Sequence, residues 1–367
     1  MKIATLLIVS LLLSGCVMSP TSSLTPQTAE AKIVIAHRGA SGYLPEHSIA
    51  SKAMAYAMGV DYIEQDVVMT KDDVLVVLHD PYLDRVTNVM TVFPNRSRVV
   101  FGQRRWLAID FTLSEIKRLS MTEAFSVDEK SKQLTASYSQ RFPLFKSSFR
   151  VSTLKEEIEL IQGLNKSTGN KIGVYVEIKA PWFHLAEGKD ISKATLELVK
   201  SFGYKTKQDN IFIQCFDPDE TKRIKQVLMP ELAMDLKLVQ LIAETSWNET
   251  MRITPEGTLT AYNYDWMFEP GAMEKIAQYA DAIGPWKPML VDDKSTRGNL
   301  IITDMTSDAH KAGMLVHPYT FRSDDGRIPD YAENFEQLLE IFYFKVGVDG
   351  LFTDFPDKAV NYLKALD

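Results

Sequence analysis

Residues 32–70, KIVIAHRGASGYLPEHSIASKAMAYAMGVDYIEQDVVMT, contain the unit from which the fold can be predicted. The runs at 32–38 and 61–70 are short and rich in Val, Ile and Tyr, which is typical of strands buried in a parallel sheet. Between them, residues 48–59 carry apolar side chains at helical spacing and end in Gly59, a helix stop signal. The stretch therefore predicts a strand, a helix and a parallel strand, with the polar loop that begins at His37 where the first strand ends.

The same kind of strand recurs through the rest of the chain. Six further runs, generally separated by segments with helical spacing, lie at 171–180, 210–217, 236–243, 281–286, 313–322 and 347–356. Eight strand and helix pairs predict a (β/α)8 TIM barrel, and a doubly wound open sheet is the competing α/β architecture. In such barrels the catalytic groups lie at the carboxyl ends of the strands and in the loops that follow.

One segment is too long for a connecting loop. Residues 82 to about 150, between the second and third barrel strands, combine a polar stretch, one predicted helix at TLSEIKRLS and a second polar stretch. We interpret this segment as an insertion at the catalytic end of the barrel, where a lid could shape the substrate site. A separately folded small domain is the alternative.

The N-terminus has the pattern of an export signal. Lys2 precedes an apolar run at 3–13 that is too short to span a bilayer, and Leu13-Ser14-Gly15-Cys16 is similar to the lipobox of bacterial lipoproteins. This predicts a signal peptide at 1–15, a lipidated Cys16 with a flexible tether over 16–31, and an enzyme domain at 32–367. A plain signal peptide cut a few residues later is the alternative.

These segments also predict where the protein acts. Because Val rather than Asp follows Cys16, we expect an outer-membrane lipoprotein of a bacterial cell envelope, with the domain facing the periplasm or the cell surface. Stable attachment to the membrane would come from several acyl chains. With Cys16 lipidated, Cys215 has no partner for an internal disulfide, and its apolar surroundings predict a small buried residue rather than a nucleophile.

Charge limits the partners. Lys and Arg total 41 against 48 Asp and Glu, a net charge of −7. The chain has no basic block that could neutralise a run of phosphates, so nucleic acid is excluded as the expected partner. The oligomeric state is open, a homodimer included.

Three acids are predicted to meet in the barrel mouth. Glu64 and Asp66 stand two apart on the second strand and therefore leave the same face, and Glu177 lies on the third strand, two residues before Lys179. Two carboxylates about 4 Å apart repel by roughly 4 kcal/mol at an effective dielectric of 20. A Ca²⁺ or Mg²⁺ ion would relieve this repulsion, and pairing with Arg38 and Lys179 is the structural alternative.

Two histidines stand beside the predicted acids. His37 ends the first strand and His79 closes the run VLVVLHD, and a pair of imidazoles near anions suggests an acid and a base for catalysis. Arg38 and Lys179 add positive charge, which points to an anionic substrate, most simply a phosphate ester. Ordinary salt bridges around a barrel rim are the alternative.

Aromatic residues near the strand ends are candidates for lining a substrate pocket. We name Phe355 for this role, with Trp182, Phe183 and Tyr319 as further candidates. Lys179 could bind phosphate or could pair with Glu177. His317 is expected to be structural.

The motifs HRGASGYLPEHS, YIEQDVVMTKDDVLVVLHDPYLDRVTNV, YVEIKAPWF and GLFTDFP resemble those of the glycerophosphodiester phosphodiesterases. QCFD, LVQLIAETSWNET and VHPYTFRSD are similar to a bacterial periplasmic branch of that family. The resemblance implies hydrolysis of glycerophosphodiesters to sn-glycerol 3-phosphate and an alcohol, with calcium as the metal in that branch.

The resemblance also implies roles for particular residues. Glu64, Asp66 and Glu177 would bind the metal, His37 and His79 would be the general acid and base, and Arg38 would hold the phosphate. Many relatives read Pro-Glu-Asn where this chain reads Pro-Glu-His, so the contribution of His47 is open.

The sequence disfavours two other chemistries and leaves two alternative functions open. RGASGY misses the Gly-x-Ser-x-Gly elbow of serine hydrolases, and no phosphate-binding P-loop motif occurs in the chain. A phosphodiesterase directed at lysophospholipids would use the same site, with a broad apolar groove in place of a small polar pocket. A surface lipoprotein that binds a host or envelope partner is the alternative from another class, because a fold alone does not fix function.

Overall fold

The computed structural model describes residues 32–128, 130–131, 133–254 and 256–366. The predicted signal peptide, the lipidated Cys16 and the tether over 16–31 lie outside these residues. Within the described ranges, no helix combines the length and apolar character needed to cross a membrane.

Eight parallel strands form the barrel. They are β1 (Ile33–Ala36), β2 (Tyr62–Met69), β8 (Gly173–Ile178), β9 (Ile211–Cys215), β10 (Lys237–Leu241), β13 (Ala282–Gly284), β14 (Leu315–Val316) and β15 (Gly350–Thr353). Each barrel strand from β1 to β13 pairs with the next barrel strand in the chain, and β1 pairs in parallel with β15. All eight lie within the runs identified in the sequence, so the predicted (β/α)8 barrel is confirmed.

Backbone hydrogen bonds close the last gap in the barrel. The segment that continues from β14 runs beside β15, where the Phe321 N–H donates to the Phe352 carbonyl at 2.8 Å and the Phe352 N–H donates to the Pro318 carbonyl at 3.0 Å. An open doubly wound sheet would leave two unpaired edges at this position. The alternative architecture is therefore excluded.

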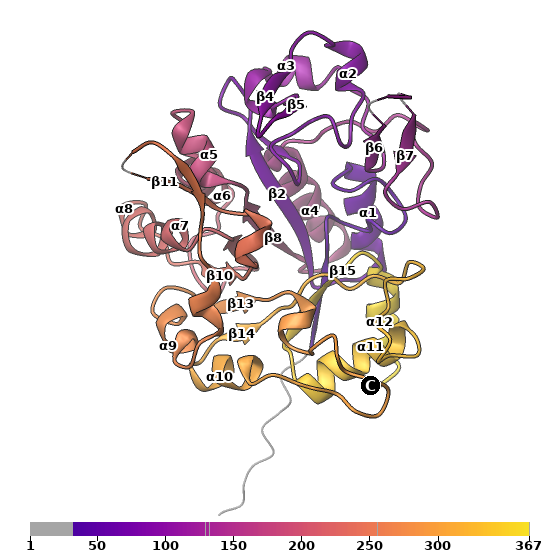
Figure 1. Ribbon diagram of the computed structural model, residues 1–367, viewed down its shortest axis with the longest axis vertical. Helices are drawn as coiled ribbons and strands as arrows, with labels where there is room; N and C mark the ends of the chain where they lie inside the picture. The colour runs from indigo at the N-terminus through magenta and orange to yellow at the C-terminus, as the bar shows by residue number, and fades with distance from the viewer. Residues whose placement is uncertain (1–31, 129, 132, 255, 367) are drawn as a thin grey trace, which may run out of the picture. The chain divides into compact units, whose positions relative to one another are not determined.

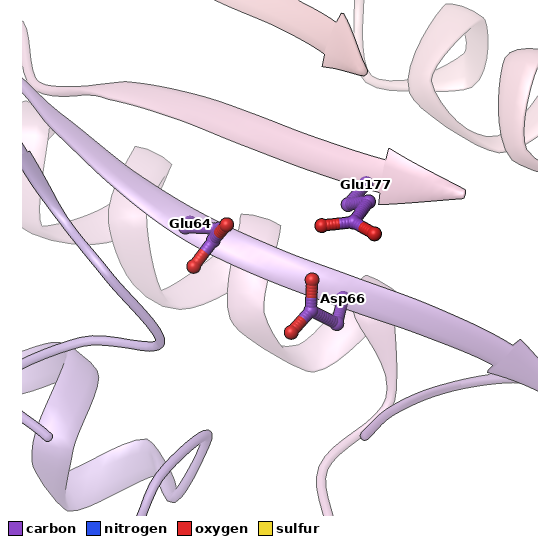
Figure 2. Close-up of side chains that lie close together, drawn as sticks. All are labelled: Glu64, Asp66 and Glu177. Carbon is purple, nitrogen blue, oxygen red and sulfur yellow. The ribbon is translucent and has the colours of Figure 1, made fainter. Parts of the chain in front are cut away.

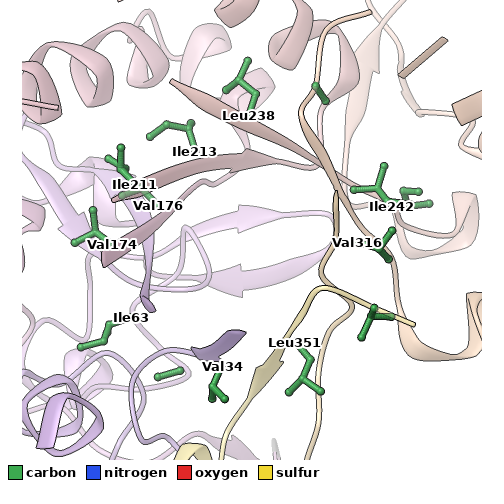
Figure 3. Packing of buried hydrophobic residues seen from close by; sticks show 14 of the residues in the cluster. Val34, Ile63, Val174, Val176, Ile211, Ile213, Leu238, Ile242, Val316 and Leu351 are labelled. Carbon is green, nitrogen blue, oxygen red and sulfur yellow. The ribbon is translucent and has the colours of Figure 1, made fainter. Parts of the chain in front are cut away.

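The strands bury side chains on both faces, as parallel strands between helices do. The barrel interior contains one small cluster, Ile35, Tyr175, Phe212, Val239, Ala282 and Phe352, in which the rings of Tyr175 and Phe212 stack 4.8 Å apart. The outer face of the strands carries a larger apolar layer against the helices (Figure 3), including Val34, Ile63, Val174, Ile213 and Leu238. This packing holds the strand ends, and the side chains on them, in fixed positions.

Helices surround the barrel (Figure 1). They are α1 (Ile49–Met58), α4 (Leu154–Thr168), α5 (Pro181–Ala186), α6 (Ile191–Ser201), α7 (Pro218–Arg223), α8 (Met229–Glu231), α9 (Ala272–Ile276), α10 (Met305–Lys311), α11 (Phe335–Glu340) and α12 (Pro356–Lys364). Ser48 caps α1 by accepting a hydrogen bond from the Ser51 N–H, and Gly59 ends it at φ 79°, a conformation that favours glycine. The local signals that end each helix thus return the chain to the next strand.

The long segment after β2 forms secondary structure of its own. β3 (Leu75–Val77) pairs antiparallel with β2, and residues 82–150 contain α2 (Val89–Val92), α3 (Leu113–Ile116) and two hairpins, β4 (Arg98–Val100) with β5 (Gln103–Arg105) and β6 (Phe125–Val127) with β7 (Leu134–Ala136). Figure 1 shows these elements gathered beyond the upper end of β2. Their apolar cluster includes Val68 of β2 and Val76 of β3 together with Phe111. The insertion is therefore packed onto the carboxyl end of the barrel strand.

A third hairpin, not anticipated from the sequence, follows β10. It pairs β11 (Met251–Ile253) with β12 (Leu259–Ala261).

Candidate functional site

The three predicted acids meet at the carboxyl ends of two neighbouring strands. In the β2 and β8 register Asp66 lies opposite Glu177, and Glu64 lies two residues before Asp66 on the same face. One carboxylate oxygen from each residue lies within 4.8 Å of the others, and all three residues are buried. Figure 2 shows the carboxylates of β2 and β8 pointing toward one another.

Burial and mutual repulsion change the acidity of this cluster. Burial, with the neighbouring Asp66 charge, raises the pKa of Glu64 to about 8. Burial also raises the pKa of Glu177 well above its usual range, despite the opposing charge of Lys179. Burial alone would raise the pKa of Asp66, but the hydrogen bond from His47 and the charge of Lys179 hold it well below its usual range. The protein alone does not neutralise three ionised carboxylates here.

Two oxygens at this cluster lack partners. Among the described residues, Asp66 Oδ1 and Gln214 Oε1 are buried and accept no hydrogen bond. Lys179 Nζ lies 2.6 Å from Glu177 Oε1, and Arg38 Nε lies 3.6 Å from Asp66 Oδ2, so the alternative of pairing with cations is met in part. Buried oxygens without donors, next to carboxylates, are the ligand set of a hard divalent cation. The residues present therefore fit a Ca²⁺ or Mg²⁺ ion.

Each of the two predicted catalytic histidines is oriented by an aspartate. His37 Nδ1 lies 2.6 Å from Asp354 Oδ1, and His79 Nδ1 lies 2.7 Å from the Oδ1 of Asp80. A carboxylate at Nδ1 fixes the tautomer with the proton on that nitrogen, which leaves Nε2 free for a ligand. Burial, together with the Arg38 charge, lowers the pKa of both imidazoles, that of His37 to about 4.

Both histidines border one cavity of about 310 Å³ together with Arg38, Glu64 and Glu177. The same cavity has an aromatic part of its lining that was not foreseen from the sequence except at Tyr319; it consists of Phe216, Trp247, Trp286, Tyr319 and Phe352. The rings of the two tryptophans lie 5.2 Å apart and nearly perpendicular. Charged and aromatic groups thus line one space of small-molecule size.

Phe355 does not border this cavity, so its predicted place in the substrate pocket is corrected. Its ring packs edge-on against Tyr43 at 5.3 Å, and a Cβ on Gly42 would come within 2.6 Å of it. The reason is that the chain turns into α12 directly after Asp354, which directs the ring behind the first loop. Trp182 and Phe183 also lie outside the cavity lining.

His317 is structural, as the sequence suggested. It lies inside the barrel, where its Nδ1 is 2.9 Å from the Tyr175 hydroxyl.

The sequence did not identify the residues that hold the two histidines. Arg85 Nε donates to Asp80, and Arg85 NH2 donates to Glu46. Glu46 also accepts a hydrogen bond from Arg38 NH1. Asp80 stands next to His79, so adjacency was the available signal. Asp354 lies within the quoted run GLFTDFP, but nothing local indicates that it meets the first strand.

His47, whose contribution was open, contacts the acid cluster directly. Its Nε2 lies 2.8 Å from Asp66 Oδ2, and its Nδ1 lies 3.2 Å from Lys52 Nζ. Because an ammonium group can only donate, Nδ1 accepts and the Nε2–H donates to Asp66. The imidazole is thereby neutral and orients the carboxylate, leaving Asp66 Oδ1 free.

Lys52 is fully buried and forms an ion pair with Glu157 at 3.1 Å. Replacing Lys52 with Met is expected to lower the free energy of unfolding by about 3–5 kcal/mol, because the Glu157 charge loses its partner in the core. Urea unfolding measures the change, and the double variant Lys52→Met/Glu157→Leu should recover much of it. The exposed pair Lys155 and Glu159 provides the control, since losing it costs less than about 1 kcal/mol. A Lys52→Met loss as small as the Lys155→Met loss would contradict this account.

Known proteins are similar to this chain over its whole length. The model of the glycerophosphoryl diester phosphodiesterase family matches residues 37–358. A glycerophosphodiester phosphodiesterase of Haemophilus influenzae is 48% identical, covering 100% of both chains, and one of Treponema pallidum is 41% identical, covering 93% of this chain and 94% of that protein.

Solved structures share the fold. A putative glycerophosphoryl diester phosphodiesterase of Silicibacter pomeroyi has a TM-score of 0.61 at 22% identity, covering 92% of this chain and 94% of that one. An Oleispira antarctica phosphodiesterase, solved with its product sn-glycerol-3-phosphate, has a TM-score of 0.57 at 18% identity, covering 91% and 97%. With the family model and the two close relatives, the chain belongs to the glycerophosphoryl diester phosphodiesterase family.

Proposed function

We propose that this phosphodiesterase hydrolyses glycerophosphodiesters at a divalent ion held by Glu64, Asp66 and Glu177, with His37 and His79 transferring protons. One observation carries the proposal: two imidazoles, each with Nδ1 on an aspartate, border the same cavity as the acid cluster. An ordinary salt-bridged rim does not account for two histidines prepared in this way beside a buried carboxylate oxygen, Asp66 Oδ1, to which no described residue donates.

The reaction then follows from the chain's own groups. Arg38, which borders the cavity, binds a phosphate oxygen. One histidine takes a proton from the neighbouring glycerol hydroxyl or from a water as its oxygen forms a bond to phosphorus. The other gives a proton to the alkoxide as its bond to phosphorus breaks. If the glycerol hydroxyl is the nucleophile, a cyclic phosphate forms, and water then opens it in a second step in which the two histidines exchange roles. The bound ion would supply charge neutralisation at the phosphate oxygens.

The products are sn-glycerol 3-phosphate and an alcohol, in keeping with the product bound to the Oleispira relative. The cavity volume of about 310 Å³ favours small water-soluble diesters over the lysophospholipid alternative, which would need a broad apolar groove. A calcium ion is preferred in the proposal because its flexible coordination tolerates an all-carboxylate set with an amide oxygen nearby.

The envelope location belongs to the same proposal. The run Leu13-Ser14-Gly15-Cys16, with Val17 after it, supports an outer-membrane lipoprotein whose domain faces the periplasm or the cell surface. The lipid anchor would then be the contact with the membrane, and the substrate would be taken from solution.

Products released from glycerophosphocholine test the proposed reaction. Purified protein is expected to release choline and sn-glycerol 3-phosphate in equal amounts, because the proton is delivered to the choline oxygen. Chromatography of the products distinguishes choline from phosphocholine. Release of phosphocholine and glycerol would mean that the other phosphoester bond is cut, and turnover of lysophosphatidylcholine at a comparable rate would favour the lipid-directed alternative.

A further inference from the structure

Arg141 follows the β6 and β7 hairpin of the insertion, and its side chain contacts loops at the carboxyl end of the barrel. Its NH1 donates to the Ser41 carbonyl at 3.1 Å, and its Nε and NH2 donate to the two carboxylate oxygens of Asp324 at 2.9 and 2.8 Å. NH2 also donates to Asp354 Oδ2 at 2.6 Å. One guanidinium of the insertion therefore joins three loops at the carboxyl end of the barrel.

The Arg141 side chain is buried, and its donors are paired. The Arg141 side chain is 5% exposed, and its guanidinium carbon lies 3.7 Å from the centre of the Tyr138 ring. Burying a guanidinium is unfavourable unless its donors are satisfied by acceptors of opposite charge. Here four of its N–H groups have acceptors: three are oxygens of the Asp324 and Asp354 carboxylates, and the fourth is the Ser41 carbonyl.

Asp354 connects this guanidinium to the proposed chemistry. Its Oδ2 accepts from Arg141 and, at 2.8 Å, from Arg322 Nε, while its Oδ1 faces His37 Nδ1. With Oδ2 fixed by two guanidinium groups, the carboxylate cannot rotate away from the imidazole. The orientation of His37 thus depends on a residue outside the barrel.

We propose that Arg141 is a positioning residue of the phosphodiesterase site, acting through Asp354 to hold His37 with Nε2 toward the diester. The inference rests on the proposed role of His37. It gives the insertion a part in the reaction itself, in addition to any part in covering the substrate. Lysine cannot replace this arginine fully, because an ammonium group lacks the planar fork that spans two carboxylates.

Steady-state kinetics of Arg141→Ala and Arg141→Lys test the inference. We expect kcat for glycerophosphocholine to fall about tenfold or more in Arg141→Ala, as for other groups that orient catalytic ligands, and to fall less in Arg141→Lys. Arg141 borders a neighbouring cavity that shares His37 and His79 with the aromatic-lined one. If Arg141 acts by positioning His37, KM should change little, whereas a rise in KM would mean that Arg141 contacts the substrate directly. Guanidinium chloride at millimolar concentration should restore part of the Arg141→Ala rate.

Arg150 provides the matched control. It lies in the same insertion, is exposed, and donates to the Leu119 carbonyl and the Ser120 hydroxyl, away from Asp354. Arg150→Ala should retain the wild-type kcat and should not respond to guanidinium. Wild-type kcat in Arg141→Ala, or an equal loss in Arg150→Ala, would overturn the inference.

A double-mutant cycle with Asp354→Asn covers the case in which Arg141→Ala folds poorly. If Arg141 acts through Asp354, then Arg141→Lys/Asp354→Asn should be no slower than Asp354→Asn alone. Losses that multiply would overturn the inference. Failure of the underlying function is recognised separately, because His37→Ala would then also keep the wild-type rate.

Discussion

Hydrolysis of glycerophosphocholine is expected to fall at least about a thousandfold when divalent cations are removed from the purified protein with a chelator. The reason is the acid cluster of Glu64, Asp66 and Glu177. Burial raises the pKa of Glu64 and of Glu177, and no described residue donates a hydrogen bond to Asp66 Oδ1. Without the ion, the cluster would supply no positive charge to the phosphate that Arg38 is placed to bind. Adding Ca²⁺ back should restore the rate more fully than Mg²⁺.

Binding of the ion can be measured without turnover. Isothermal titration of Ca²⁺ into the stripped protein should give one site. Calcium affinity should fall in each of the variants Glu64→Gln, Asp66→Asn and Glu177→Gln. The loss should exceed the roughly 10- to 100-fold that is typical of removing a residue that only hydrogen-bonds to a metal ligand. Asp61→Asn is the control, because Asp61 is an exposed carboxylate just before β2, at the opposite end of that strand. Full activity in the chelated protein, with no calcium binding, would refute the metal site.

Turnover is expected to fall at least about a hundredfold in His37→Ala and in His79→Ala, with the fold retained. Each imidazole is held through Nδ1 by a carboxylate, Asp354 or Asp80, and each lies on the cavity wall. Circular dichroism and thermal unfolding establish that the variants are folded. His310→Ala is the control, since that exposed histidine pairs with Asp349 away from the cavity.

A diester with a p-nitrophenol leaving group separates the roles of the two histidines. p-Nitrophenolate departs without a proton, so the variant that lacks the general acid should regain much of its rate on this substrate, while the variant that lacks the base should not. Wild-type rates for both alanine variants on glycerophosphocholine would rule out the assignment. Equal recovery in both variants would rule out distinct acid and base roles.

The barrel could be predicted because its signals are local. The strands are short runs rich in apolar residues and generally bounded by turn residues, and several helices have apolar spacing with a cap, as at Ser48 and Thr153. The small hairpins at β4 and β5, β6 and β7, and β11 and β12 were missed. Their strands have three residues each and mostly exposed side chains, so no apolar alternation marks them.

The acids and histidines could be located because a strand-end rule places them at one edge of the barrel. Sequence patterns could not locate Arg141, Arg322 and Trp247 at the site, because no periodicity describes the path of the segments that carry them. Phe355 was misplaced for the same reason: its position beside a strand end is correct, but the start of α12 determines where its ring points. Sequence thus locates groups on strands better than those on loops.

The pairing of the first strand with the last also determines when the enzyme can become active. His37 and Asp354 are 317 positions apart in the chain. β1 has strand partners on both sides only when β15 is present. A ribosome makes the N-terminal end first, so a nascent chain has neither a closed barrel nor an oriented imidazole until its final strand has emerged. Contacts this distant along the chain are slow to form. Synthesis therefore yields no active fragment, and catalysis begins only after the complete chain has folded.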